Sequence, residues 1–199
     1  MRPNLLHRLV LICVLCLALI ATGCSAQWIN VALADLPVLT QMALNISTLV
    51  STPHSGEQLD ASEAVAIQNI SAEASKDLML LQQLYQDYKA NPSVNGIRRI
   101  QSVIADLNAN LPALLQAGHI KNPVFSTKVS VAVNLILTTV NTFAALIPEN
   151  AVTTSSQSLS SRQNPVSGPK ELKRRWNQQV CSTTTEEMAD SASSSCPLQ

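Results

Sequence analysis

Apolar residues recur at steps of three and four along four stretches of the chain, which is the spacing of one face of an α-helix. The four stretches are residues 29–50, 67–88, 97–114 and 129–147. Four apolar faces joined by short connections can all be buried if the helices face one another. The pattern therefore predicts an all-α fold, an antiparallel four-helix bundle with up-down-up-down topology.

Local signals mark the ends of these predicted helices. Asp60 and Glu63 have the spacing of a capping box at the start of the second helix. Asn122 followed by Pro123 predicts the start of the fourth helix, because proline fits the first helical position. We expect Gly118 to end the third helix in the left-handed conformation that glycine tolerates.

Two of the stretches leave more than one interpretation open. Pro37 lies inside the first stretch, and because proline lacks an N–H and clashes one turn back, we expect a kink or a break near Asp35 or Leu36. Residues 129–148 carry no charge and reach the roughly 20 residues that cross a bilayer. Their asparagine and threonine side chains fit a buried bundle helix better than one surrounded by lipid. A transmembrane helix at 129–148 is the alternative.

The N-terminus has the features of a secretory signal peptide. Arg2 and Arg8 lie in a short basic start, and residues 9–21 follow without a charge. This apolar run is shorter than the roughly 20 residues of a membrane-spanning helix. Small residues at 21–24, with the sequence Ala-Thr-Gly-Cys, complete the pattern.

Residues 21–24 resemble the lipobox of bacterial lipoproteins, where signal peptidase II cleaves before a cysteine. The resemblance covers the leader alone, and alanine stands at position 21 where the pattern prefers Leu, Val or Ile. It implies a signal peptide at 1–23 and acylation of Cys24. Ordinary cleavage after Ala26, which would release the protein, is an alternative, and an uncleaved anchor is another.

The same resemblance implies a location and a partner. A lipoprotein of this class carries three acyl chains, which hold a protein firmly at a bilayer. We therefore expect an exported protein anchored in the membrane, on the periplasmic or outer surface. Ser25, rather than Asp, follows Cys24, and such lipoproteins usually move to the outer membrane in Gram-negative bacteria. Besides the membrane, an envelope protein or an anionic polymer is the expected partner.

The composition changes after residue 149. Residues 24–149 form the predicted bundle domain, whereas residues 150–199 are rich in Ser and Thr and are predicted to be a flexible, disordered tail. A short basic segment at 170–180 lies within this tail and is compatible with a helix. Its alternative role is a solvated helix end in which Glu171 neutralises part of the charge. The candidate contacts with an anionic surface are Lys170, Lys173, Arg174, Arg175 and Trp176.

Three cysteines remain once the leader is removed: Cys24, Cys181 and Cys196. If Cys24 is acylated, the other two form an even pair in an oxidising compartment, and a disulfide between them is expected. Such a bridge would stabilise the chain by about 3 kcal/mol in the chain-entropy model. Two unpaired thiols are the alternative.

Composition and motifs exclude several function classes. The 13 basic and 13 acidic residues cancel, so a nucleic-acid polycation is excluded. His54 and His119 are the histidines of the mature chain, and neither lies in a hydrolase or zinc motif. We expect no enzymatic activity, no metal and no cofactor. The acidic residues Glu57, Asp60 and Glu63 are better explained by the dipole of the second helix than by a calcium site.

These observations predict a lipid-anchored helical protein of the cell envelope with a structural or protein-interaction role. One alternative is a bundle that binds a small apolar ligand, with Asn134 and Asn141 as candidate polar contacts. The other is an integral membrane protein that spans the bilayer at 129–148.

Overall fold

The computed structural model describes residues 27–49, 59–147, 168–181 and 198 of the chain. These residues form five α-helices and a π-helical turn, and no strand occurs among them. The fold of the described part is therefore all-α, as the periodicity predicts. The elements are α2 (Gln27–Thr48), α3 (Ala61–Ala90), α4 (Val94–Ala117), α5 (Pro123–Leu146), α6 (Pro169–Trp176) and the π-helical turn η2 (Asn177–Cys181).

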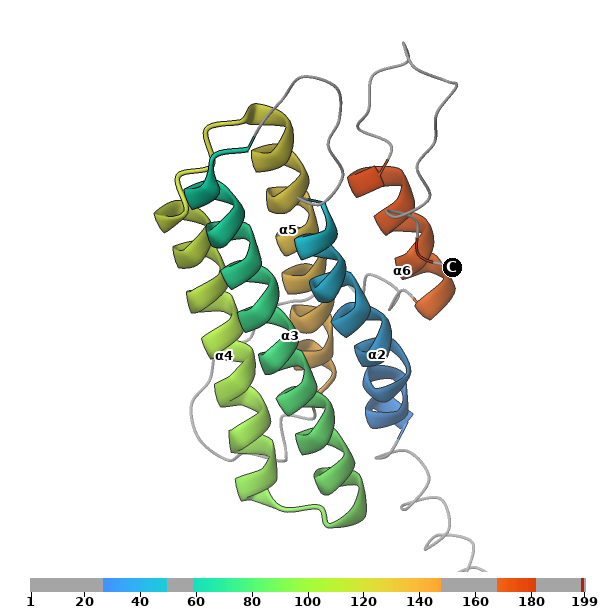
Figure 1. The fold of residues 1–199 in the computed structure, drawn as a ribbon. Coiled ribbons are helices and arrows are strands. Elements are labelled where there is room, and N and C mark those ends of the chain that lie inside the picture. Colours follow the sequence, from blue (N-terminus) through green and yellow to red (C-terminus); the bar gives the residue numbers. More distant parts are fainter. Residues whose placement is uncertain (1–26, 50–58, 148–167, 182–197, 199) are drawn as a thin grey trace, which may run out of the picture.

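Helices α2 to α5 lie side by side (Figure 1). Helix α2 packs on α3, α3 on α4, α4 on α5, and α5 in turn on α2. Each helix turns its apolar stripe towards the other three, so the four stripes enclose one hydrophobic core. Fully buried members of this core include Leu36, Leu39, Ile70, Leu78, Ile100, Leu107, Ile136 and Phe143.

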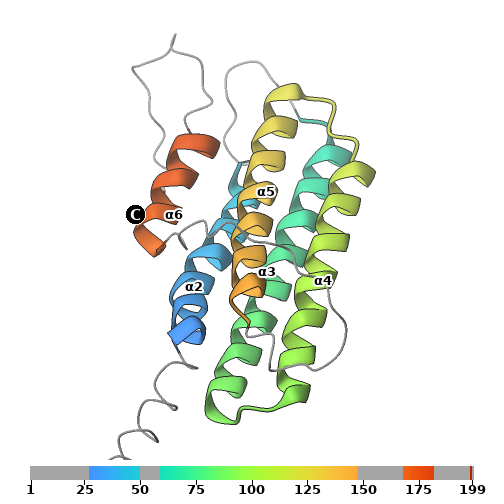
Figure 2. The same ribbon diagram turned by 180° about the vertical axis from the view of Figure 1, so that it is seen from behind.

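Helix α6 and η2 pack against the outside of α2 and α5 (Figure 2). Leu172, Trp176 and Val180 recur at steps of four, and all three side chains are fully buried. Because burial of each large apolar side chain contributes about 1.5–3 kcal/mol, this stripe is sufficient to hold the segment on the bundle. The predicted domain boundary at residue 149 is therefore wrong for residues 168–181, which belong to the helical body rather than to a disordered tail.

Helix α2 continues through Pro37, so of the predicted kink or break, the break does not occur and the kink stays a prediction. The proline ring is exposed to solvent, whereas Leu36 and Leu39 on the same turn are fully buried in the core. Packing of these leucines holds the helix together on both sides of the proline, which outweighs the one backbone hydrogen bond that the proline removes.

The predicted helix starts are confirmed. The Glu63 carboxylate accepts a hydrogen bond from the backbone N–H of Asp60 at 3.0 Å, which completes the capping box of α3. The Asn122 side chain accepts hydrogen bonds from the backbone N–H groups of Val124 and Phe125 at 3.0 and 3.3 Å. Both caps satisfy N–H groups that have no partner within their own helix.

The prediction for the end of α4 is wrong by one residue. Gly118 is right-handed, with φ −67° and ψ −17°, and the left-handed residue is His119, with φ 41°. The lack of a side chain at 118 serves another purpose: a Cβ there would make a tight contact, 3.0 Å from the Cβ of Ala66 in α3. Gly118 therefore lets α3 and α4 approach each other closely.

In the part of the chain that the structure describes, two helical segments are long and apolar enough to cross a membrane, judged by length and composition. They are Trp28–Thr48 and Pro123–Leu146, and about half of each is buried against other helices. The core helix of a soluble protein has the same length and composition. The membrane-spanning alternative for 129–148 therefore stays a prediction.

Candidate functional site

The basic segment predicted at 170–180 consists of α6 and η2. Its apolar stripe faces the bundle, and this orientation turns the charged side chains outwards. Lys170 and Arg174 are exposed, and Lys173 and Arg175 are half-buried. The structure thus places the four predicted cations on one short helix at the surface.

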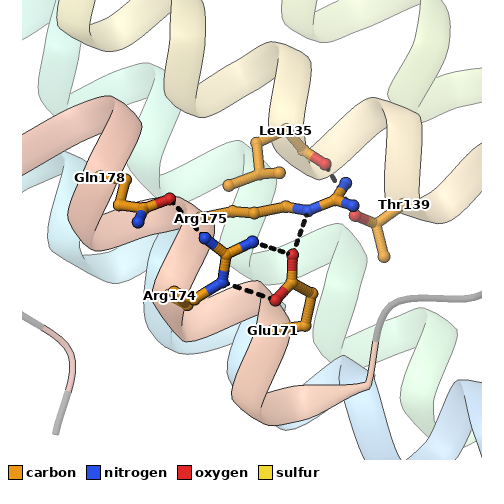
Figure 3. Close-up of polar contacts among 6 residues, drawn as sticks. All are labelled: Leu135, Thr139, Glu171, Arg174, Arg175 and Gln178. Carbon is orange, nitrogen blue, oxygen red and sulfur yellow. Dashed lines mark hydrogen bonds and ion pairs between the residues drawn. The ribbon is translucent and has the colours of Figure 1, made fainter.

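Glu171 binds two of the arginines (Figure 3). Arg174 donates to its carboxylate through Nε at 2.7 Å and through Nη2, and Arg175 donates through Nε at 3.0 Å. Arg174 also donates to Oε1 of Gln178 at 2.7 Å. The hydrogen bonds from Arg174, and then those from Arg175, lower the pKa of Glu171 to about 2. This carboxylate therefore stays ionised at physiological pH and neutralises part of the positive charge of α6.

Trp176 cannot contact an anionic surface in this arrangement, so that part of the prediction is wrong. Its side chain is fully buried and belongs to the stripe that holds α6 on the bundle. The sequence places the tryptophan next to cations, but the helical period turns it to the opposite face. The remaining candidates for an anionic contact are the four cations alone.

The structure tests the predicted roles of the three cysteines to different extents. Cys24 and Cys196 lie outside the described residues, so acylation of Cys24 stays a prediction. Cys181 is half-buried and forms a disulfide bond, although its pairing with Cys196 also stays a prediction. The backbone N–H of Leu198 donates to Oδ1 of Asn177 at 2.9 Å, and Nδ2 of Asn177 donates to the Leu198 carbonyl at 3.3 Å. These two bonds hold residue 198 against η2, the element that contains Cys181.

Glu63 connects two parts of the bundle, a role that the sequence did not reveal. Besides the bond from Asp60, its carboxylate accepts hydrogen bonds from the backbone N–H groups of Lys121 and Asn122, the latter at 3.2 Å. Both residues lie in the connection between α4 and α5. The hydrogen bonds from Asp60 and Lys121 lower the pKa of Glu63 below its usual value. Since backbone donors occupy its oxygens, Glu63 acts as a structural clamp. Within the described ranges, no group of three or more His, Cys, Asp or Glu side chains is placed to hold a metal ion.

Three buried side chains have polar atoms without hydrogen-bond partners and were also missed. They are both carboxylate oxygens of Asp35 in α2, and Oδ2 of Asp77 and the hydroxyl of Tyr85 in α3. Asp35 and Tyr85 are 0% exposed. Burial raises the pKa of Asp35 to about 6 and also raises the pKa of Tyr85. Asp35 could have been found from the sequence, because it lies three residues after Ala32 and one before Leu36 on the buried face of α2.

The two asparagines proposed as contacts for an apolar ligand do not face the core. Asn141 exchanges two side-chain hydrogen bonds with Asn108 of α4, at 2.8 and 2.9 Å. Asn134 is exposed. The Asn108–Asn141 pair fixes the register of α5 against α4, and neither asparagine of α5 is placed to contact a ligand inside the bundle.

A shallow pocket of about 360 Å³ lies between the start of α3 and the end of α4. Val65 and Asn69 of α3 and His119 after α4 are among its lining residues. The side chains of all three are exposed, so this pocket does not shield its polar groups from solvent. The pocket therefore gives no specific indication of a ligand.

No family model matches the chain, and no curated protein or solved structure matches it either. The function therefore has to be inferred from the residues and their geometry.

Proposed function

We propose that the protein is a lipid-anchored helical protein of the bacterial cell envelope with a structural or protein-interaction role. The observation that carries the proposal is the order of segments at the N-terminus. A leader whose residues 21–24 resemble a lipobox is followed almost at once by α2, which begins at Gln27. A lipid on Cys24 would therefore hold the helical body directly at a bilayer surface.

The arrangement of α2 to α5 as an up-down-up-down four-helix bundle belongs to the same proposal. Its support is the cycle of contacts from α2 through α3 and α4 to α5 and back to α2. The connection between α3 and α4 and that between α4 and α5 are short, which favours antiparallel neighbours (Figure 1). Such a bundle is a rigid body suited to holding a surface in a fixed orientation.

A non-catalytic role is proposed because the buried ionisable groups are scattered. Asp35 lies on α2, Asp77 and Tyr85 lie on α3 and Lys128 lies on α5, and no ion pair joins them among the described residues. General acid–base or nucleophilic catalysis needs such groups within hydrogen-bond reach of one another. In this proposal the protein acts by binding, with the membrane and an envelope protein or anionic polymer as partners.

Metabolic labelling with a palmitate analogue tests the anchor. The full chain and the Cys16→Ala variant, which changes a leader cysteine, should both be labelled, whereas Cys24→Ala should not. The intact mass of the purified protein should correspond to a chain that begins at Cys24 and carries acyl groups. Equal labelling of Cys24→Ala, or a mass that begins at Gln27, would refute the anchor and support ordinary secretion.

An integral membrane protein is the second candidate, and the apolar segment Pro123–Leu146 favours it. Alkaline extraction of membranes from cells that express the full chain separates the two candidates when it is combined with a lipase that removes ester-linked acyl chains. A protein held by its lipid should leave the membrane after this treatment. A protein that spans the bilayer should stay in the pellet.

A further inference from the structure

The start of α2 lies beside the turn between α3 and α4. The ring of Trp28 contacts the ring of Tyr85 edge-on, with the ring centres 5.6 Å apart, and the ring of Tyr88 at 5.9 Å. A Cβ on Gly96 would lie 3.0 Å from Cδ2 of Tyr88. Trp28, the end of α3 and the first turn of α4 are therefore contiguous. Figure 1 shows the start of α2 and the turn between α3 and α4 towards the same end of the helices. We call Trp28 and residues 85–99 the α3–α4 end.

The α3–α4 end is rich in exposed positive charge. Its charged residues are the cations Lys89, Arg98 and Arg99 and the acid Asp87, and all four are exposed. None of them forms an ion pair with another described residue. Val94, the first residue of α4, is 49% exposed beside them. Cations around an exposed apolar side chain are typical of surfaces that contact the headgroups of a bilayer.

The opposite end of the helices has no excess of positive charge. Asp60 and Glu63 lie at the start of α3, whereas Lys121 lies in the connection between α4 and α5 and Lys128 lies in the second turn of α5. Charge is therefore distributed unequally along the helix axes in the described part of the chain. The positive end is the end at which the chain enters from its N-terminus.

The proposed anchor would bring this positive end to the membrane. Cys24 precedes the first residue of α2 by three positions. An extended chain of that length spans about 10 Å, which is close to the distance over which salt screens charge in physiological solution. A lipid on Cys24 therefore keeps the start of α2, and with it the α3–α4 end, within electrostatic range of the headgroups.

We propose that the α3–α4 end is a contact surface for anionic phospholipid headgroups and orients the helical body on the membrane. This inference rests on the proposed anchor for its location, but its charges belong to the folded body itself. Helix α6 is the weaker candidate for the same contact, because Glu171 binds two of its cations. In contrast, Arg98 and Arg99 have no such partner among the described residues.

The test uses the full chain on two kinds of vesicle, phosphatidylcholine alone and phosphatidylcholine with phosphatidylglycerol. Flotation measures attachment, and amide hydrogen exchange of residues 85–99 and 169–181 measures contact. Exchange of residues 85–99 should slow on the anionic vesicles only. Each cation near an anionic surface changes the equilibrium constant for membrane contact about fivefold. The double substitution of Arg98→Gln with Arg99→Gln should therefore lower this constant about 25-fold. Lys76→Gln with Lys121→Gln removes the same charge outside both candidate surfaces and should leave the contact intact.

The remaining outcomes separate the surface from the anchor. If the protein floats with both kinds of vesicle and residues 85–99 exchange equally fast on both, the anchor stands and the proposed contact surface is overturned. If the protein floats only with anionic vesicles, and the Arg98 and Arg99 substitutions abolish this, the anchor is refuted and the contact surface stands. If the protein floats with neither kind of vesicle, both proposals are overturned. Slowed exchange at 169–181 alone assigns the contact to α6 and overturns the inference. Loss of contact in both double variants alike also overturns it, because only total charge would then matter.

Discussion

Asp35 is predicted to destabilise the folded protein at neutral pH. It lies on the buried face of α2, is 0% exposed and has no hydrogen-bond partner for either carboxylate oxygen. Burial favours the neutral carboxylic acid over the charged carboxylate, and this raises the pKa of Asp35 from 3.8 to about 6. The folded chain therefore keeps a proton on Asp35 at pH values where the unfolded chain has already lost it.

The size and sign of the effect follow from this difference. A rise of about two pKa units corresponds to about 3 kcal/mol. Because the folded-state pKa is the higher one, stability falls as the pH rises from about 4 to about 6, and the full penalty applies above pH 6. At pH 7 the ionised Asp35 should thus cost about 3 kcal/mol of the free energy of unfolding.

The substitution Asp35→Asn keeps the shape of the side chain and removes its charge. Urea unfolding followed by far-UV circular dichroism should show a gain of up to about 3 kcal/mol at pH 7. At about pH 4, where Asp35 is protonated in the folded chain, the variant and the wild type should be nearly equal. Asp87→Asn changes an exposed aspartate of α3 and should alter stability by less than about 0.5 kcal/mol at either pH.

A loss of stability in Asp35→Asn at pH 7, with Asp87→Asn unchanged, would refute this reasoning. It would mean that the carboxylate makes a favourable interaction in the folded protein. A gain of the same size at both pH values would refute it as well, because the benefit would then not come from removing a charge.

Three further predictions concern packing and the Glu63 clamp. Trp176→Ala should cost about 3–5 kcal/mol in urea unfolding, because a fully buried indole leaves a cavity, while exposed Arg174→Ala should cost little. Gly118→Ala should lower the Tm, since its Cβ would press on α3, whereas Gly168→Ala, with no atom within 4 Å of the added Cβ, should not. The pKa of Glu63 is lowered on folding, so its contribution is present above about pH 4.5 and lost below it. Glu63→Gln should therefore be destabilised at pH 7 and should lose less stability than the wild type on acidification.

The features predicted correctly from the sequence are those governed by local physics. Helical periodicity placed the stripes of α2 to α5, and the caps at Asp60 and Asn122 use groups only two or three residues apart. The left-handed residue after α4 was assigned to Gly118 because glycine tolerates that conformation best. The glycine is instead used for contact with Ala66, a residue far away in the sequence.

The features that were missed depend on tertiary contacts. Nothing near Glu63 in the sequence shows that its carboxylate also binds the connection between α4 and α5. The stripe of Leu172, Trp176 and Val180 has helical spacing, but its polar and basic neighbours suggested a solvated segment. Only the position of α6 against α2 and α5 shows that these side chains complete the core.

The contact between α6 and α2 has a consequence for biogenesis. If the protein is exported as proposed, the chain crosses the membrane from its N-terminus, so α2 reaches the far side long before α6 does. During that interval the flank of α2 and α5 that receives Leu172, Trp176 and Val180 has nothing from α6 to shield it. A chain that stopped at residue 149 would contain all four long helices and would still expose the hydrophobic surface of α2 and α5 that α6 covers. Early termination should therefore lead to aggregation rather than to a smaller functional protein.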